Sequence, residues 1–280
     1  MKLVVNADDF GLTPGINQGI LDCFLANSIS SATLMVTTSA TDEAVDIAKS
    51  NTALGIGLHF NLTLGRPLNK PETISSLVRE DGSFHSRVDF EKRMILGRIR
   101  HADVIREFYS QVRRFETLGI VMTHVDSHQH VHLFPAVFNI LAEYCERENI
   151  PLRVPWVWPQ SWNVSCKRSL RAIFLKLLIH RNIIRWQNRL KYNAGFASIF
   201  DLSIPPNRIT IDNYLSIISN IKKGPFELMV HPSRSDQSLV GLTNISEISL
   251  TERRILSTYN LKELAQPYGI ELVSYKKALE

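Results

Sequence analysis

Cysteine is scarce in this chain. Only Cys23, Cys145 and Cys166 occur among 280 residues, an odd number of widely spaced thiols. A disulfide framework needs paired cysteines, and a cysteine-based zinc site needs close pairs of them. We therefore predict three reduced thiols and neither kind of cross-link.

Long apolar runs are also missing. No stretch approaches the roughly 20 apolar residues of a membrane-spanning helix. The N-terminus lacks the charged segment, apolar run and small-residue cleavage site of a secretory leader. With 44% hydrophobic and 21% charged residues, the composition is that of an ordinary globular protein. We expect a cytoplasmic protein that folds as a single domain over residues 1–280.

One long segment lacks acidic residues. Between Glu148 and Asp201 there is no carboxylate side chain, but there are nine basic residues. They are Arg153, Lys167, Arg168, Arg171, Lys176, Arg181, Arg185, Arg189 and Lys191. Subtracting these nine charges from the net charge of +5 leaves about −4 for the rest of the chain. The basic character is therefore local, and we do not predict a nucleic-acid partner.

Residues 167–191 of this segment place apolar side chains near helical spacing among the basic ones. This pattern predicts one or two basic amphipathic helices. Two interpretations stay open. The apolar side packs on the protein or on a second subunit, giving a homodimer, or it binds an anionic membrane surface. The second interpretation predicts a peripheral protein at the inner membrane face and a substrate on a lipid carrier.

Apolar strands alternate with helices along the chain. The expected strands are 2–8, 31–37, 55–62, the histidine-rich stretch to 132, 151–156, 226–231 and 271–275. The expected helices are 14–26 with Thr13 as its N-cap, 42–49, 102–118, 135–148, 212–222 and 251–265, the last with Ser249 and Glu252 at capping-box spacing. Excursions are expected at about 63–100 and 160–198. This alternation predicts an α/β fold, an irregular (β/α) barrel of about seven parallel strands.

The stretch His-Val-Asp-Ser-His-Gln-His-Val-His at 124–132 holds four of the nine histidines. In an extended strand alternate residues share a face, so His124, Asp126, His128, His130 and His132 would line one side. Imidazole and carboxylate groups are ligands of divalent metals, and histidine also acts as an acid or base near neutral pH. The stretch therefore predicts a metal-binding or catalytic edge.

Other chemically capable residues also fall where expected strands end. Asp8 and Asp9 end the first strand, His59 the third and His231 a later one, while Asp126 and His128 end the fourth. In a (β/α) barrel the active site lies at the carboxyl ends of the strands. We therefore expect these six groups to meet at one mouth.

Four motifs together resemble those of the YdjC-like carbohydrate deacetylases, which include chitooligosaccharide and hopanoid-biosynthesis-associated deacetylases. They are Val-Asn-Ala-Asp-Asp-Phe-Gly at 5–11, Gly-Leu-His-Phe-Asn-Leu at 57–62, the histidine-rich stretch at 124–132 and Glu-Leu-Met-Val-His-Pro at 227–232. The resemblance implies a barrel related to polysaccharide deacetylases, a divalent metal (Mg²⁺ or Zn²⁺) and hydrolysis of an N-acetyl group on an amino sugar. Ser233 stands where the family commonly has Gly, a change that affects at most the substrate rim.

Residue roles follow from this resemblance. It implies that His59 and His128 bind the metal and that the Asp8–Asp9 pair supplies the third ligand and the general base. By analogy we assign Asp9 to the metal and Asp8 to the base, although neighbouring strand residues point in opposite directions and the reverse assignment stays open. His231 is the expected acid. Further residues expected to support the ligands or contact the sugar are Asp126, His130 and Asn61.

Two other functional classes account for part of this pattern. Two histidines and one carboxylate also describe non-haem iron oxygenases, but an oxygenase leaves the second aspartate unexplained. A basic protein that binds membranes or nucleic acid accounts for residues 167–191 but not for six titratable groups at strand ends. The sequence therefore favours a metal-dependent hydrolase.

Overall fold

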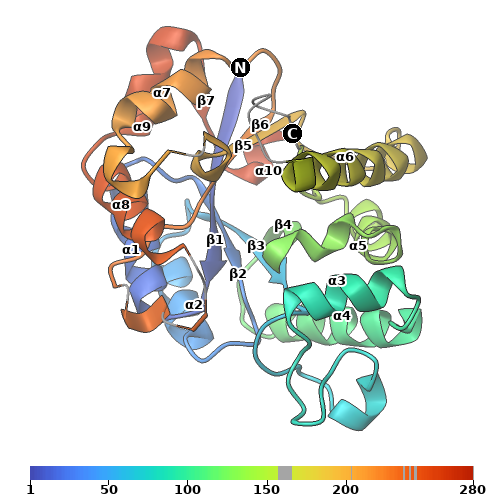
Figure 1. Ribbon diagram of the computed structural model, residues 1–280. Coiled ribbons are helices and arrows are strands. Elements are labelled where there is room, and N and C mark those ends of the chain that lie inside the picture. Colours follow the sequence, from blue (N-terminus) through green and yellow to red (C-terminus); the bar gives the residue numbers. More distant parts are fainter. Residues whose placement is uncertain (157–165, 203, 236, 240, 243–244, 280) are drawn as a thin grey trace.

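A sheet of seven parallel strands lies at the centre of the molecule (Figure 1). The computed structural model describes residues 1–156, 166–202, 204–235, 237–239, 241–242 and 245–279. The strands are β1 (Lys2–Phe10), β2 (Ser31–Leu34), β3 (Gly55–Phe60), β4 (Met122–Ser127), β5 (Gly195–Ser198), β6 (Phe226–Val230) and β7 (Glu271–Leu272). Their order is β4-β3-β2-β1-β6-β5, and β7 pairs with the first residues of β1.

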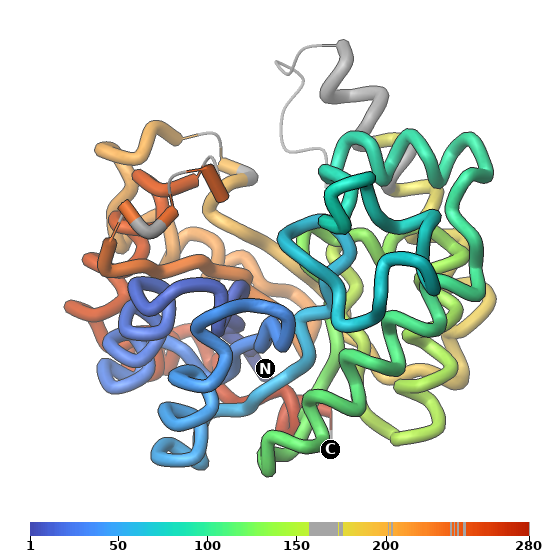
Figure 2. The backbone as a smooth tube through the Cα atoms, turned by 90° about the horizontal axis from the view of Figure 1, so that it is seen from below, coloured from blue at the N-terminus to red at the C-terminus, as the bar shows by residue number. Residues whose placement is uncertain are grey.

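Helices cover the sheet on both sides (Figures 1 and 2). On one side lie α1 (Pro14–Leu25), α2 (Thr41–Ser50), α7 (Ile211–Ser219), α8 (Ser246–Leu256) and α9 (Leu261–Ala265). On the other lie α3 (Arg87–Ile95), α4 (His101–Glu116), α5 (Pro135–Arg147) and α6 (Cys166–Trp186), and α10 (Tyr275–Ala278) follows β7 near the C-terminus. The α/β class and the parallel seven-stranded sheet are as predicted.

The central strands are apolar because both of their faces are covered. Every residue of β3 is buried, and so is every residue of β1 after Lys2. Parallel strands flanked by helices read as nearly continuous apolar runs for this reason. The predicted N-cap of α1 is confirmed, since the Thr13 side chain accepts a hydrogen bond from the Ile16 N–H and Pro14 occupies the first turn.

The hydrogen-bonded path of the sheet has two ends, β4 and β5, and residues 151–154 lie between them. Val125 of β4 donates its N–H to the Pro151 carbonyl and accepts from the Arg153 N–H. On the other side, the Leu152 N–H donates to the carbonyl of Lys191, shortly before β5. This segment bridges the gap in an otherwise barrel-like arrangement.

Two strand predictions around this gap are corrected. Residues 151–156 do not form a strand, because they make only an isolated bridge at Leu152, and Pro151 and Pro155 have no N–H to donate. The predicted excursion at 160–198 ends earlier than expected, because β5 occupies its last four residues and pairs with β6. So short a strand beginning with Gly195 gives little alternation to detect.

The last predicted helix is also corrected. Residues 251–265 are divided between α8 and α9, with a break before the α9 N-cap Asn260. Ser249 lies inside α8, where its hydroxyl donates to the Ile245 carbonyl, so the predicted capping box is wrong. Glu252 does not cap the helix, because its buried carboxylate accepts a hydrogen bond from the backbone N–H of His231, the residue after β6.

The predicted excursion at 63–100 contains no strand among the named strands of the sheet. The excursion contains a short 3-10 helix (Pro71–Ile74) and α3. None of the helices in the described ranges is both long and apolar enough to cross a bilayer.

Candidate metal centre

The end of β1 carries two adjacent aspartates whose side chains leave the strand in unusual directions. Asp9 has a left-handed backbone with φ of 64°, and the pairing of β1 with β2 shifts register between Ala7 and Phe10. Such a bulge re-aims side chains beside functional sites. Strict alternation therefore fails at this point, and both Asp8 and Asp9 reach buried polar partners.

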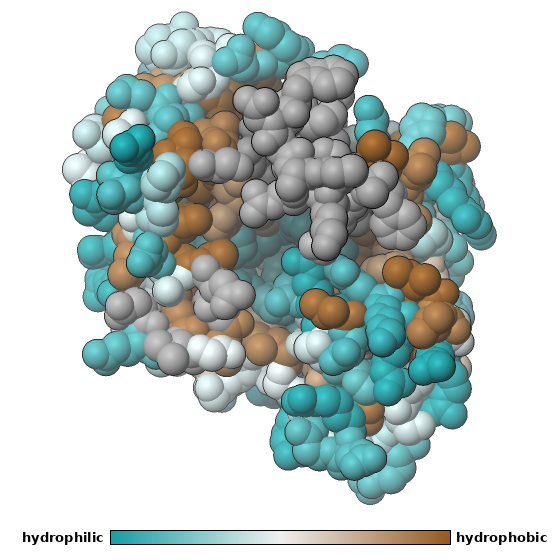
Figure 3. Space-filling view, viewed as in Figure 1, coloured by the Kyte–Doolittle hydropathy of each residue, from teal (hydrophilic) through white to brown (hydrophobic). Residues whose placement is uncertain are grey.

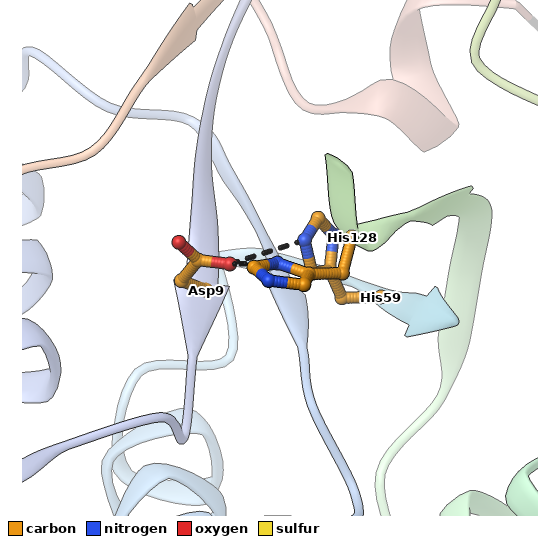
Figure 4. Close-up of side chains that lie close together, drawn as sticks. All are labelled: Asp9, His59 and His128. Atoms are coloured by element: carbon orange, nitrogen blue, oxygen red, sulfur yellow. Dashed lines mark hydrogen bonds and ion pairs between the residues drawn. The ribbon is translucent and has the colours of Figure 1, made fainter. Parts of the chain in front are cut away.

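Asp9, His59 and His128 converge from β1, β3 and the residue after β4 (Figure 4). Asp9 Oδ1 lies 2.8 Å from His128 Nδ1 and 3.2 Å from His59 Nε2. All three side chains are nearly inaccessible to solvent. One ligand atom from each lies within 4.8 Å of the others, which is the grouping predicted for a metal.

The unsatisfied atoms of this group fit a cation. Among the described residues, His128 Nε2 is buried without a hydrogen-bond partner, and His59 Nε2 faces only Asp9 Oδ1, at 3.2 Å. Buried polar atoms are normally paired, so orphaned ring nitrogens beside a carboxylate indicate a missing ligand. Two imidazoles and one carboxylate match a catalytic site that keeps positions open for water and substrate.

Asp126 fixes the orientation of His59. Its Oδ1 lies 2.7 Å from His59 Nδ1, so the ring directs Nε2 toward Asp9. A carboxylate behind a metal-binding histidine sets the tautomer and ring direction in this way. Burial lowers the pKa of His59, but the Asp126 charge and hydrogen bonds outweigh it and raise that pKa to about 10.

A second acidic group, made of Asp8, His59 and Asp126, is also compact enough for a metal. Its carboxylates, however, already face the fully buried guanidinium of Arg153. Arg153 lies 2.5 Å from Asp8 Oδ1, 2.7 Å from Asp126 Oδ2 and 2.5 Å from Glu227 Oε1. A fixed positive charge at this position opposes a second cation, so the Asp9 group is the better metal site.

Arg153 was not predicted as a site residue. By sequence Arg153 belongs to the basic segment, whereas in the structure its side chain is fully buried beside three carboxylates. A detectable signal exists, because Arg153 and Glu227 each interrupt an apolar run, and buried charges require partners. Because Arg153 and Glu227 carry opposite charges and lie in two expected strands, a buried ion pair between them could have been predicted from the sequence.

The two aspartates at the end of β1 differ in environment. Burial raises the pKa of Asp8, but the Arg153 guanidinium outweighs it and holds that pKa well below its usual range. Burial also raises the pKa of Asp9, but the charges of His128 and His59 and their hydrogen bonds to the carboxylate outweigh burial and lower that pKa well below its usual value. Both carboxylates are therefore ionised at neutral pH.

His231 follows β6 and lies close to Asp8. Its Nε2 is 3.9 Å from Asp8 Oδ2, and the Phe200 ring packs edge-on at 5.2 Å. Its Nδ1 is buried and has no hydrogen-bond partner within the described part of the chain. Burial lowers the pKa of His231, although the negative charges of Asp8 and Asp9 oppose this. The six groups predicted to meet at one mouth are thus close together.

The single-faced strand predicted for 124–132 is wrong, because β4 ends at Ser127 and a 3-10 helix occupies His128–Leu133. His128 therefore turns toward Asp9, while His132 binds the Ser127 hydroxyl and the Arg153 carbonyl. The reason lies in Gln129 and His130, whose φ angles of 55° and 56° turn the chain out of the strand.

His124 lies inside the barrel and away from the Asp9 group. Its Nε2 is 3.0 Å from Asn6 Oδ1, and its ring stacks on Tyr275 at 4.1 Å. Gly57 leaves room for that ring, because a Cβ at this position would lie 2.6 Å from His124 Cε1. His124 is therefore a packed interior residue, and the glycine of the second motif has a steric cause.

Asn61 organises the loop after β3. Its Oδ1 accepts the N–H groups of Thr63 and Leu64, and its Nδ2 donates to the Thr37 hydroxyl and the Leu64 carbonyl. All of its hydrogen-bonding capacity is used within the protein. This geometry supports a role in holding the loop that follows His59.

Glu252 gives the site a pH-dependent support. Its carboxylate accepts the His231 N–H at 2.6 Å and the Tyr214 hydroxyl at 3.1 Å. Burial raises the pKa of Glu252 to about 8, although these hydrogen bonds lower it. In the unfolded chain this carboxyl group has a pKa of 4.5, so between pH 4.5 and about 8 it is protonated in the folded protein and ionised in the unfolded chain. The stability that this group contributes is therefore fully present below pH 4.5 and is lost as the pH rises through about 8.

We expect Glu252→Gln to flatten the pH dependence of stability, because its amide has no ionisable group but can still accept the His231 N–H through its oxygen and donate its N–H to the Tyr214 oxygen. As the pH is raised from 4.5 to about 8, the melting temperature of the wild type should fall by several degrees relative to that of the variant. This expectation uses a shift of roughly 2–4 °C in melting temperature per kcal/mol of stability. Differential scanning calorimetry of both proteins measures it, and parallel pH curves would contradict the prediction.

Comparisons with known proteins agree with the motifs. The family model described as YdjC-like protein matches residues 2–266. A carbohydrate deacetylase of Vibrio cholerae serotype O1 is 39% identical over 98% of this chain and 95% of that protein. A chitooligosaccharide deacetylase of Proteus mirabilis is 30% identical over 98% of this chain and 97% of that protein.

A solved structure from Enterococcus faecalis V583, described as a candidate cellobiose-phosphate cleavage protein, has the same fold. It superposes with a TM-score of 0.80 at 25% identity and covers 100% of this chain and 99% of that one. Sequence and fold are thus shared along almost the whole length, and this chain belongs to the YdjC-like protein family.

Proposed function

We propose that the protein is a metal-dependent hydrolase that removes the N-acetyl group from an amino sugar. The observation that carries this proposal is the convergence of Asp9, His59 and His128 beside Asp8 and His231. Asp9, His59 and His128 fit a divalent metal, and Asp8 and His231 offer an acid–base pair. The names of the relatives, carbohydrate and chitooligosaccharide deacetylase, support the substrate class.

Asp9, His59 and His128 would hold the metal. Zn²⁺ suits a site with two imidazoles better than Mg²⁺, which prefers oxygen ligands. When bound, the metal would polarise the acetyl carbonyl and lower the pKa of a water molecule. Asp126 would keep His59 in its ligating orientation through the 2.7 Å contact.

Asp8 and His231 would move the protons. Asp8 is kept ionised by Arg153, so it can accept the proton of the attacking water. Amide cleavage also requires protonation of the amine that leaves. His231 Nε2, 3.9 Å from Asp8 Oδ2, would take up the proton that Asp8 removed from the water and pass it to the leaving amine, so that both groups return to their starting states.

Acetate release from N-acetylglucosamine oligomers, combined with metal analysis, tests the proposal. The hydrolase should release one acetate per amine formed, and a chelator should abolish turnover. Oxygen consumption would instead indicate a non-haem oxygenase, and absence of any turnover with oligomers and lipid-linked N-acetylglucosamine would indicate a binding protein. The lipid-linked sugar is included because both forms present the same N-acetyl group.

Gln129 and His130 would contact the sugar. Gln129 Oε1 and His130 Nδ1 are buried without a partner in the described structure. The His130 ring lies 5.8 Å from the Phe196 ring, which in turn lies under the Arg153 guanidinium. Two consecutive left-handed residues other than glycine are strained, and such strain collects at functional sites.

Gln129→Gly should therefore stabilise the protein and weaken its substrate binding. Glycine removes a backbone penalty of about 1 kcal/mol, which raises the melting temperature by roughly 2–4 °C. Loss of one hydrogen bond raises KM about tenfold and leaves kcat and metal content unchanged. Asn149→Gly is the matched control, because Asn149 has φ of 56° on the exposed surface away from the site. An unchanged KM in Gln129→Gly would remove this residue from the recognition site.

A further inference from the structure

The described side chains of helix α6 form two apolar faces, and only one of these two faces is packed. Ile179, Ile183 and Trp186 are buried against α5 and the 3-10 helix after β4. On that side the Trp186 indole N–H donates to Asn139 Oδ1, and Asn182 Nδ2 donates to the Leu133 carbonyl. The predicted packing of the helix on the protein is thus present, but it uses only part of the apolar residues.

The second apolar face points to solvent. Ile173, Leu177 and Ile184 are 56%, 63% and 58% exposed. At about 100° per residue they fall within an arc of about 40°, which lies about 140° around the helix from Ile179 and about 160° from Trp186. This stripe of Ile173, Leu177 and Ile184 is what we call the outer stripe of α6.

Cations flank the outer stripe on both sides. Lys176 lies on one side, Arg181 and Arg185 lie on the other, and all three are exposed. None of them forms an ion pair with any described residue. Hydrophilic and hydrophobic residues accordingly lie side by side over α6 in Figure 3. The sequence around α6 adds no carboxylate between Glu148 and Asp201.

Charge and size decide what can cover this stripe. A second copy of the chain, placed on it by a two-fold axis, would bring three cations against three cations. Three aliphatic side chains on one helix also fall far short of the roughly 800 Å² per partner of a stable protein interface. An anionic bilayer meets both conditions, because it attracts the flanking cations and takes up isolated aliphatic side chains at the headgroup boundary.

We propose that the outer stripe of α6, with Lys176, Arg181 and Arg185, is a binding surface for anionic lipid bilayers. The aliphatic side chains enter the headgroup–acyl boundary, and the three cations contact acidic headgroups. This binding is independent of the deacetylase chemistry, so its failure would leave the proposed function unaffected.

Cosedimentation of the full chain with vesicles tests the proposal. Vesicles of phosphatidylcholine alone are compared with vesicles of phosphatidylcholine and phosphatidylglycerol in equal parts, at low and high salt. The wild type should bind the anionic vesicles, and high salt should weaken this binding at least tenfold. Equal binding to both lipids, or to neither, would overturn the proposal.

Two triple variants separate the contributions of charge and apolar contact. Lys176→Gln with Arg181→Gln and Arg185→Gln should lower the partition coefficient about a hundredfold at low salt. Ile173→Ser with Leu177→Ser and Ile184→Ser should lower it at least tenfold at both salt concentrations. All six positions are exposed, so melting temperatures should stay within a few degrees of the wild type.

Matched controls come from other exposed positions. Lys70→Gln with Lys222→Gln and Lys223→Gln removes the same charge. Val88→Ser with Ile95→Ser and Leu96→Ser removes exposed aliphatic side chains from α3 and its C-cap residue. Binding should survive in both. Equal losses in the controls, or a dimer in sedimentation velocity that only the α6 serine variant dissociates, would overturn the proposal.

Discussion

His128→Ala should leave the protein folded and without its divalent metal, and acetate release should fall by more than a hundredfold. His128 is one of three groups around the proposed metal, with Nδ1 2.8 Å from Asp9 Oδ1. Removing even a group behind a ligand costs metal sites about ten- to a hundredfold in affinity or activity, so loss of a ligand costs more. Plasma mass spectrometry of the purified protein and an acetate assay measure the two effects.

His128 is a cleaner choice than His59 for this experiment. His59 also neutralises Asp126, so its removal leaves a buried carboxylate short of a partner and threatens the fold. The matched control is His101→Ala, because His101 is an exposed histidine at the start of α4. Full metal occupancy and turnover in His128→Ala would show that the metal is held elsewhere.

Much of this site was accessible from the sequence because a parallel sheet converts sequence position into spatial position. Asp9, His59 and His128 are each at the carboxyl end of an expected strand, and these ends meet at one mouth. The prediction that these residues meet required only that each lies near the carboxyl end of a strand, so an error of a few residues in a strand boundary did not change it. It survived even at β4, which stops at Ser127 while the prediction extended the strand to 132.

The parts that could not be predicted depend on backbone angles and long-range pairing. Nothing in the residue types of Asp9, Gln129 and His130 announces a positive φ, since only glycine strongly favours that region. The partnership of Arg153 with Asp8 spans 145 positions of sequence and depends on how the gap beside β4 is bridged. The strand ends therefore predicted that Asp9, His59 and His128 would meet, whereas the buried cation beside Asp8 was not predicted.

The two faces of α6 illustrate the same limit. Helical spacing brought Ile173, Leu177, Ile183 and Ile184 into one amphipathic pattern, and the pattern allowed either packing or an exposed surface. The structure buries Ile183 and exposes the other three. Adjacent residues of a helix are about 100° apart, so Ile183 and Ile184 can serve different faces.

Arg153 matters for the choice between the two aspartates. The Asp8 carboxylate is held by both terminal nitrogens of the guanidinium and by Asn6 Nδ2 at 2.9 Å. Asp9 has no contact with Arg153 and faces the two histidines instead. This division supports Asp9 as the ligand and Asp8 as the base.

Asp8→Asn should consequently keep its metal and lose activity by roughly a hundred- to ten-thousandfold, the usual contribution of a general base. The fold should survive, because Arg153 retains Asp126 and Glu227 as anionic partners and asparagine has nearly the volume of aspartate. Asp9→Asn is the matched comparison at the neighbouring position and should instead lose the metal. Metal content decides between the two assignments: an Asp8→Asn protein without metal, beside an Asp9→Asn protein that retains it, would show that the ligand and the base are the reverse of those proposed.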